Sequence, residues 1–148
     1  MARYIGERES SHSGDNPPHG GDNTQKVVEL YISTLPVPKS NRYIRRRGGK
    51  VFKPPRIKNW EVRALWEIKQ QYSGSTLLGP LRMEVELTLP NRRKRDIDNM
   101  LKSLWDILEK AKVIGNDDQI QELYVIKRYS KGQQGTKIRI IEGISDTQ

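Results

Sequence analysis

Residues 81–101, LRMEVELTLPNRRKRDIDNML, contain the two patterns from which the fold of this chain is predicted. In residues 81–89 every second side chain is apolar, and the side chains between them are charged or polar. Because successive side chains of a β-strand point to opposite faces, this alternation predicts a strand with one face in the core. Pro90 cannot donate a hydrogen bond to a neighbouring strand and is expected to end it.

A helix is predicted directly after this strand, over residues 97–112. Its apolar side chains recur at steps of three and four residues, which places them on one broad face. Asp96 stands at the expected N-cap position, where a side-chain oxygen accepts a hydrogen bond from the first turn. The segment 81–112 is therefore predicted as a strand, a basic connection and an amphipathic helix.

The remaining elements follow from similar patterns. A β-branched run predicts a strand at residues 27–32, Gly48 and Gly49 indicate a hairpin turn within residues 39–53, and residues 56–72 are predicted as a helix. Residues 119–129 and 136–141 are predicted to form a closing hairpin. This order predicts an α+β fold, with a single domain whose mixed β-sheet packs against two main helices.

The chain of 148 residues has room for one domain. Residues 1–25 are expected to be a disordered polar tail, because they cannot bury enough apolar surface to offset the entropy lost on ordering. The domain is predicted over residues 26–143, with residues 144–148 as a C-terminal tail. The N-terminal residues lack the apolar segment of a signal peptide, and no apolar run is long enough to span a membrane, so a cytoplasmic protein is expected.

The charge of the chain indicates a polyanionic partner. The chain carries 27 basic and 18 acidic residues, a net charge of +9. Residues 26–143 alone carry 25 basic and 13 acidic residues, which gives +12. Nucleic acid is the expected partner, because each phosphate contacted releases counterions; the alternative is a charge that serves solubility or adhesion to anionic surfaces.

Residue types that are absent narrow the possible chemistry. The chain has no cysteine, and its two histidines, His12 and His19, lie in the predicted tail. This excludes disulfides, thiolate metal sites and cysteine nucleophiles. Catalysis in the folded part would have to depend on carboxylates, Lys, Arg, hydroxyls and a metal held by oxygen ligands.

Two pairs of carboxylates are the candidate metal ligands. Asp96 and Asp98 follow four consecutive basic residues, and Lys102 lies one helical turn after Asp98. Asp117 and Asp118 follow the predicted helix. If the strand after them returns antiparallel beside the strand that ends at Pro90, three or four carboxylates converge. All-oxygen ligands select Mg²⁺ or Mn²⁺, which would polarise a phosphate and activate water.

Each of these residues also has a structural interpretation. Asp96 is then only a helix cap, Asp98 and Lys102 form a surface ion pair, and Asp117 and Asp118 are turn residues. On that interpretation the chain is a non-enzymatic basic nucleic-acid-binding protein. A third hypothesis is another Mg²⁺-dependent nuclease of the restriction type, although no Glu-x-Lys element follows a suitably placed Asp.

Basic residues in two segments are the candidate DNA contacts. One set surrounds the predicted hairpin turn, and the other precedes Asp96. The run of Arg45, Arg46 and Arg47 is expected to contact phosphates, which carry no sequence information. They are Lys39, Arg42, Arg45, Arg46, Arg47, Lys50, Arg92, Arg93, Lys94 and Arg95.

Three segments resemble the RusA-type Holliday junction resolvases. Residues 95–102, RDIDNMLK, and residues 113–120, VIGNDDQI, resemble the family's Asp-x-Asp-Asn element and the Asp-Asp pair that follows one helix later. Residues 35–43, LPVPKSNRY, are similar to the N-terminal part of the family pattern. The resemblance covers residues 27–143.

The resemblance implies a small homodimeric endonuclease, intertwined or side by side, that cuts four-way DNA junctions by paired nicks during recombination and repair. It implies that the enzyme uses Mg²⁺ as its cofactor and that Mn²⁺ can substitute. It implies neither a membrane partner nor a small-molecule cofactor. Asp96, Asp98 and Asp118 would hold the metal with support from Asp117, and Lys102 would steady the developing phosphate charge or the leaving group. The choice between Asp117 and Asp118 rests on the family pattern alone. The implied location is the cytoplasm, at the nucleoid, whether the gene is a host, phage or prophage gene.

Overall fold

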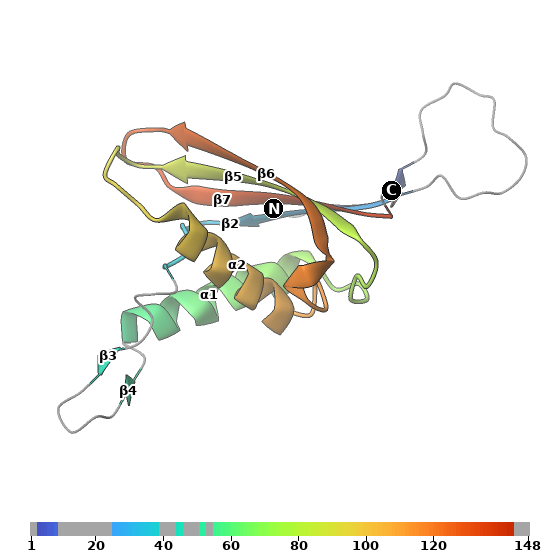
Figure 1. Ribbon diagram of the computed structural model, residues 1–148, viewed down its shortest axis with the longest axis horizontal. Helices are drawn as coiled ribbons and strands as arrows, with labels where there is room; N and C mark the ends of the chain where they lie inside the picture. The colour runs from blue at the N-terminus through green and yellow to red at the C-terminus, as the bar shows by residue number, and fades with distance from the viewer. Residues whose placement is uncertain (1–2, 9–24, 39–43, 46–50, 53–54, 144–148) are drawn as a thin grey trace, which may run out of the picture.

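The computed structural model describes residues 3–8, 25–38, 44–45, 51–52 and 55–143. Its elements in chain order are β1 (Arg3–Arg8), β2 (Gln25–Ile32), β3 (Ile44–Arg45), β4 (Val51–Phe52), α1 (Pro55–Gln71), β5 (Leu81–Leu89), α2 (Ile97–Lys110), the short 3₁₀ helix η2 (Asp117–Gln119), β6 (Ile120–Tyr129) and β7 (Gly135–Glu142) (Figure 1). Five strands form one sheet in the order β1-β2-β7-β5-β6, and β3 pairs with β4 in a separate hairpin. The mixed sheet and the two helices confirm the predicted α+β fold.

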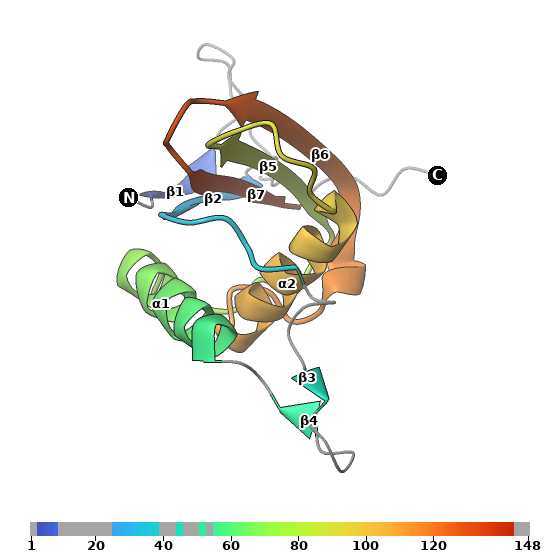
Figure 2. The ribbon, with the colours of Figure 1, turned by 90° about the vertical axis from the view of Figure 1, so that its left-hand side faces the viewer.

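Both helices cover the same face of the sheet (Figure 2). The five alternating apolar side chains of β5 all lie on this face and are at most 2 % exposed. Met100, Leu104 and Leu108 of α2 pack into the same core. Since a fully buried Leu or Met contributes about 1.5–3 kcal/mol, this face supplies much of the stabilisation that holds α2 against the sheet.

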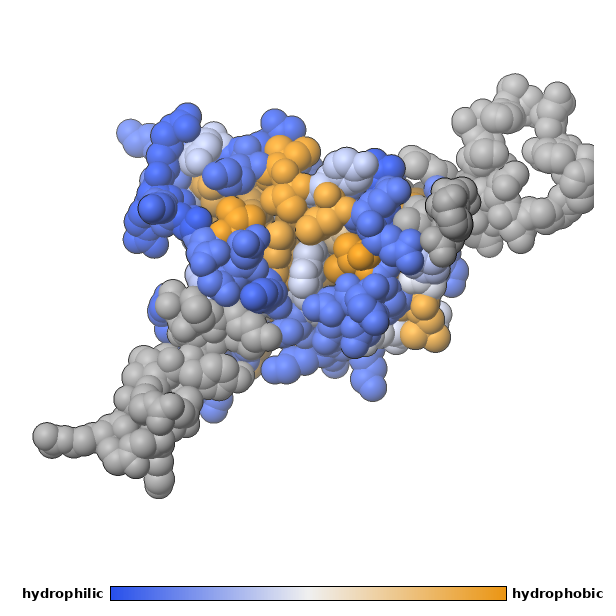
Figure 3. Space-filling model, in the orientation of Figure 1, coloured by the Kyte–Doolittle hydropathy of each residue, from blue (hydrophilic) through white to orange (hydrophobic). Residues whose placement is uncertain are grey.

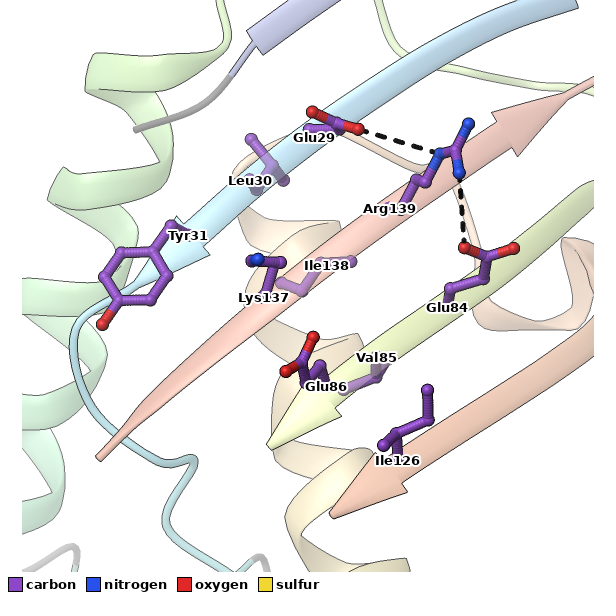
Figure 4. Close-up of a pocket in the computed structure, with 10 residues that line it drawn as sticks. All are labelled: Glu29, Leu30, Tyr31, Glu84, Val85, Glu86, Ile126, Lys137, Ile138 and Arg139. Atoms are coloured by element: carbon purple, nitrogen blue, oxygen red, sulfur yellow. Dashed lines mark ion pairs between the residues drawn. The ribbon is translucent and has the colours of Figure 1, made fainter. Parts of the chain in front are cut away.

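The opposite face of the sheet is covered by neither helix and is lined with charged side chains (Figures 2 and 4). Arg139 on β7 lies between Glu29 on β2 and Glu84 on β5, with N–O distances of 3.8 Å and 3.7 Å (Figure 4). These residues line a shallow hollow of about 350 Å³. Its cations and carboxylates alternate, so it lacks the single sign of charge that a DNA-binding surface needs.

The predicted closing hairpin is wrong. β5 lies between β6 and β7, parallel to β6 and antiparallel to β7. The loop from β6 to β7 crosses the end of β5, where the Ser130 N–H donates to the Leu89 carbonyl at 2.9 Å and the Gly132 N–H to the Pro90 carbonyl at 3.1 Å. β5, α2 and β6 thus form a crossover unit, the usual connection between neighbouring parallel strands.

The N-terminal tail also departs from the prediction. Arg3–Arg8 forms β1, which pairs antiparallel with β2, and β2 itself begins at Gln25. β1 forms because the second edge of β2 is open to backbone pairing. The six residues of β1 have no periodicity from which this pairing could be predicted. Residues 9–24 and the predicted C-terminal tail, residues 144–148, lie outside the described residues. No helix in the described part of the chain is long and apolar enough to cross a membrane.

Candidate active site

The first carboxylate pair lies at the start of α2. Asp96 is the N-cap, with extended backbone angles. Its Oδ1 accepts from the Asn99 N–H at 3.3 Å, and its Oδ2 accepts from Asn99 Nδ2 at 2.6 Å. The structural interpretation of Asp96 as a cap is therefore confirmed. Capping leaves further lone pairs of both oxygens exposed to solvent, so it does not preclude a role as a ligand.

Asp98 occupies the first turn of α2 and is exposed, as is Lys102 one turn later. The two side chains form no ion pair, and Asp98 accepts no hydrogen bond from any residue that the structure describes. A carboxylate in the first turn is favoured by the partial positive charge of the helix N-terminus. Asp98 is therefore an exposed carboxylate beside a basic segment, and neither of its oxygens has a partner among the residues that the structure describes.

The basic segment before Asp96 divides into two kinds of residue. Arg95 folds back onto its own loop, where its guanidinium donates to the Asn91 and Arg93 carbonyls, both at 3.1 Å, and Arg92 stacks over the Tyr129 ring at 4.1 Å. Arg93 and Lys94 are exposed. Hence Arg93 and Lys94 are available to bind phosphates, whereas Arg92 and Arg95 shape the loop.

A groove of about 610 Å³ lies beside Asp96. Residues 35–38 form one wall, and they are tied to α2 by the buried Ser103 hydroxyl, which donates to the Val37 carbonyl. The basic lining consists of Arg56, Arg93, Lys94 and Arg95. Four cations and one carboxylate around a groove suit the phosphate backbone of a nucleic acid.

Arg56 is a groove residue that the sequence analysis missed. It lies in the first turn of α1, which brings it to the groove from a separate part of the chain. Its only sequence signal was a basic residue at a predicted helix start. Of the other predicted DNA contacts, Arg45 is in β3, whereas Lys39, Arg42, Arg46, Arg47 and Lys50 lie outside the described residues.

The second carboxylate pair lies at the start of β6. Asp117 and Asp118 form η2 with Gln119, and both are exposed. Asn116 caps this turn, since its Oδ1 accepts from the Asp118 N–H at 2.9 Å. The Asp117 N–H donates to Glu109 Oε2 at 2.9 Å, so a carboxylate near the end of α2 also supports the turn. Neither Asp117 nor Asp118 has a side-chain partner among the described residues.

Gln119 is a second residue that the sequence did not reveal. Its Oε1 accepts from the Gly115 and Asn116 N–H groups, both at 2.8 Å. Its Nε2 donates to the Leu77 and Gly79 carbonyls at 2.9 Å and 2.8 Å. The side chain thus fixes the acidic turn to the segment that leads into β5.

The two carboxylate pairs do not converge within one chain, because the antiparallel return on which their convergence depended is absent: β6 is parallel to β5. β6 starts beside Leu81, whereas Asp96 follows the other end of β5. From Asp98 to Glu109, which contacts Asp117, α2 rises about 16 Å. Accordingly, no group of three acidic or histidine side chains in the described part of the chain is placed to hold one metal ion.

Comparisons with known proteins find relatives over most of this chain. The family model described as endodeoxyribonuclease RusA matches residues 34–141. The crossover junction endodeoxyribonuclease RusA of Aquifex aeolicus is 59 % identical over 113 residues, which cover 76 % of this chain and 90 % of the relative. The protein of the same name from Escherichia coli K12 is 33 % identical over 101 residues, 68 % of this chain and 84 % of the relative. That of Enterobacteria phage HK97 is 32 % identical over 117 residues, which cover 77 % and 98 % of the two chains.

Proposed function

Since the chain belongs to the RusA family of endodeoxyribonucleases, we propose that it is a Mg²⁺-dependent endonuclease that resolves four-way DNA junctions by paired nicks. The relatives' names give the crossover junction as their substrate. Such an enzyme would act at the nucleoid in the cytoplasm. A phage protein among its relatives is compatible with a host or a phage gene.

The observation that carries the proposal is the pair of exposed aspartates beside a basic groove. Asp96 and Asp98 offer oxygen ligands only, next to Arg93 and Lys94, which are suited to a phosphate. This donor set fits Mg²⁺, or Mn²⁺ in its place, better than zinc or copper. One chain supplies only part of the coordination, because Asp117 and Asp118 lie at the other end of α2.

We therefore propose that the active enzyme is a homodimer in which each site combines Asp96 and Asp98 of one subunit with Asp117 and Asp118 of the other. Carboxylate oxygens must approach a Mg²⁺ ion to about 2.0–2.1 Å. A separation of about 16 Å along α2 rules out shared coordination within one chain. A two-fold dimer has two such sites, which matches two cuts in one junction.

Each residue has a separate role in this proposal. Asp96, Asp98 and Asp118 would hold the metal, which when bound polarises the scissile phosphate and lowers the pKa of water. Asp117 supports Asp118. Lys102, on the same helical face as Asp98, places an ammonium group where charge develops on the phosphate or the leaving oxygen.

Cleavage of a synthetic four-way junction by the purified chain tests this function. We expect nicks in Mg²⁺ or Mn²⁺ and none in EDTA. Asp98→Asn should lower cleavage by more than about 100-fold while junction binding is retained, because even an indirect partner of a metal ligand is worth about 10–100-fold. Glu29→Gln, on the open face of the sheet, is the matched control and should cleave as the wild type does.

The non-enzymatic alternative makes different predictions for the same assay. A basic binding protein would bind the junction in a salt-dependent way, with or without Mg²⁺, and would never nick it. Cleavage by Asp98→Asn at the wild-type rate would contradict the assigned site. Equal cleavage of linear duplex and junction would contradict the proposed substrate and favour another Mg²⁺-dependent nuclease.

A further inference from the structure

The segment that follows β2, residues 33–38, is irregular and is called the strap below. In Figure 2 it leaves the end of β2 and runs across to α2. No backbone–backbone hydrogen bond of the described residues involves the strap, and Pro36 and Pro38 have no N–H group to donate. Because its backbone groups still need partners, the strap depends on side chains of other elements for its position.

Side chains from four parts of the fold supply these partners. Two of them hold the half of the strap next to β2. Glu67 of α1 accepts from the Ser33 N–H at 2.9 Å and from the Ser33 hydroxyl at 2.6 Å. The Thr136 hydroxyl of β7 donates to the Thr34 carbonyl at 2.8 Å. The strap is therefore joined to a helix and to the sheet where it begins.

The other two side chains hold the half of the strap that lines the groove. The Leu35 N–H donates at 3.0 Å to Oε1 of Gln134, in the loop between β6 and β7. Ser103 of α2 is 1 % exposed, and its hydroxyl donates to the Val37 carbonyl. A serine within a helix usually bonds back to the carbonyl four residues earlier. Here that carbonyl, of Asn99, is the more distant acceptor at 3.4 Å, so Ser103 bonds chiefly to the strap.

The strap stands opposite the loop that leads to Asp96. Residues 35–38 line the groove together with residues 90, 91 and 93–96, and Gln134 lines it as well. Figure 3 shows hydrophilic side chains over this loop. A DNA strand seated between the strap and the loop would lie at a distance from the Asp96 carboxylate that the strap determines.

We propose that Ser103 and Gln134 are positioning residues for the strand that is cut: they hold the strap so that the groove presents one phosphodiester, and not its neighbour, to the carboxylates. This inference deepens the proposed function and rests on it. Successive phosphates of one strand are only about 3.4 Å apart along the duplex axis. A misplacement of about 1 Å can cost about 100-fold in rate. A strap that shifts by such amounts would change both the rate and the position of cleavage.

Removal of either bond leaves the hydrophobic core in place. Ala has the highest helix propensity, so Ser103→Ala retains the helical preference of α2. Gln134 is exposed and contributes no apolar surface to the core. We therefore expect Ser103→Ala and Gln134→Ala to fold with a displaced strap.

The position of the nicks, mapped to single nucleotides on a four-way junction with a fixed branch point, tests the proposal. Ser103→Ala and Gln134→Ala should each lower kcat about tenfold or more and add nicks at neighbouring phosphodiesters. The Kd for the junction should stay within about twofold, because no phosphate-binding cation is removed. Ser130→Ala and Gln133→Ala, whose side chains bond to each other outside the groove, are the matched controls and should cut as the wild type does.

A conservative variant should rescue the position of cleavage. Gln134→Glu keeps an oxygen that accepts from the Leu35 N–H, so it should restore the cut position that Gln134→Ala loses. Gln133→Glu adds the same negative charge one residue away and controls for its effect on DNA affinity. Scattered nicks with Gln134→Glu, but not with Gln133→Glu, would contradict the role given to the bond with Leu35.

A hydroxyl-radical footprint of the bound junction in EDTA reports the position of the strand without cleavage. We expect Ser103→Ala and Gln134→Ala to displace or blur the protected stretch by about one nucleotide. If both variants keep the wild-type footprint and cut position and lose only folded protein, their role is structural and the proposal is overturned. A footprint that shifts in both variants, with no nicks even by the wild type, would instead contradict the proposed function and leave the positioning role standing.

Discussion

Asn99 donates two hydrogen bonds to the carboxylate of Asp96, one from its backbone N–H to Oδ1 at 3.3 Å and one from Nδ2 to Oδ2 at 2.6 Å. The first bond caps α2, and the second fixes the rotation of the carboxylate. Asp96 therefore contributes to stability as a cap and presents its remaining lone pairs in a fixed direction, which is how outer residues orient metal ligands.

Because Asp96 has these two roles, different substitutions should separate its effect on stability from its effect on cleavage. Asn caps helices about as well as Asp, whereas Ala does not. We expect Asp96→Asn to unfold in urea within a few tenths of a kcal/mol of the wild type and to lose junction cleavage. Asp96→Ala should lose the same activity and about 1 kcal/mol of stability. If Asp96→Asn cleaves normally, Asp96 is a cap only.

The acidic turn depends on the side chain of Gln119. Gln119→Ala removes two hydrogen bonds within the turn, from the Gly115 and Asn116 N–H groups, and two that join the turn to residues 77–79. Each bond contributes about 0.5–1.5 kcal/mol. We expect a loss of about 2–3 kcal/mol, since two of the four are solvent-exposed. Cleavage should fall by about 10–100-fold in kcat, as for other residues that position ligands.

Gln70→Ala is the matched control for this change, because Gln70 is exposed on α1. It should leave both the urea midpoint and kcat unchanged. Equal stability of Gln119→Ala and the wild type would contradict the role given to these bonds.

The exposed cations of the groove should control DNA affinity. Arg93→Gln and Lys94→Gln are each expected to weaken junction binding and to lower the slope of log K against log salt by about 1. Lys69→Gln, near the opposite end of α1 from Arg56, should change neither quantity. Titrations at several salt concentrations measure both, and an unchanged slope for Arg93→Gln and Lys94→Gln would show that the groove does not contact phosphates.

Glu67 on α1 accepts hydrogen bonds from Ser33, the residue after β2. This carboxylate should make the free energy of unfolding depend on pH in the acidic range. Partial burial raises the pKa of Glu67, but hydrogen bonds from the Ser33 hydroxyl and N–H and from Arg63 outweigh it, so the pKa lies below its usual value. At acidic pH the unfolded chain then binds more protons than the folded one. The stabilisation is complete above the usual carboxyl pKa of about 4.3 and is lost as the pH falls through the lower, folded value.

We therefore expect the urea midpoint of Glu67→Gln to fall less steeply than that of the wild type as the pH drops from about 5 to 3. The variant should also be the less stable protein at pH 7. Glu29→Gln serves as the control. Parallel pH profiles for Glu67→Gln and the wild type would contradict the assignment.

Local patterns in the sequence predicted those features that neighbouring residues determine. Alternation placed β5 at residues 81–89, and the capping position of Asp96 placed the start of α2. Both depend on contacts within a few residues of the chain or on one buried face. The candidate ligands, by contrast, rest on the resemblance of residues 95–102 and 113–120 to a family pattern, and stay a prediction.

Features that depend on contacts distant in sequence were not predictable in this way. A five-residue connection between β6 and β7 is typical of a hairpin, but its backbone bonds to Leu89 and Pro90 place β5 between the two strands. This reverses the direction of β6 relative to β5 and carries Asp118 away from Asp96. Arg56 reaches the groove only because α1 packs beside α2, which its own sequence context does not indicate.

Subunit mixing tests the composite site most directly. Asp98→Asn and Asp118→Asn, each inactive alone, are co-refolded with different tags, and the mixed dimers are purified. If each site draws on both subunits, a mixed dimer carries one site with both defects and one intact site, so it should nick a four-way junction in Mg²⁺. If all ligands come from one chain, both sites of the mixed dimer are defective. Mixed dimers as inactive as either variant alone would therefore contradict the account.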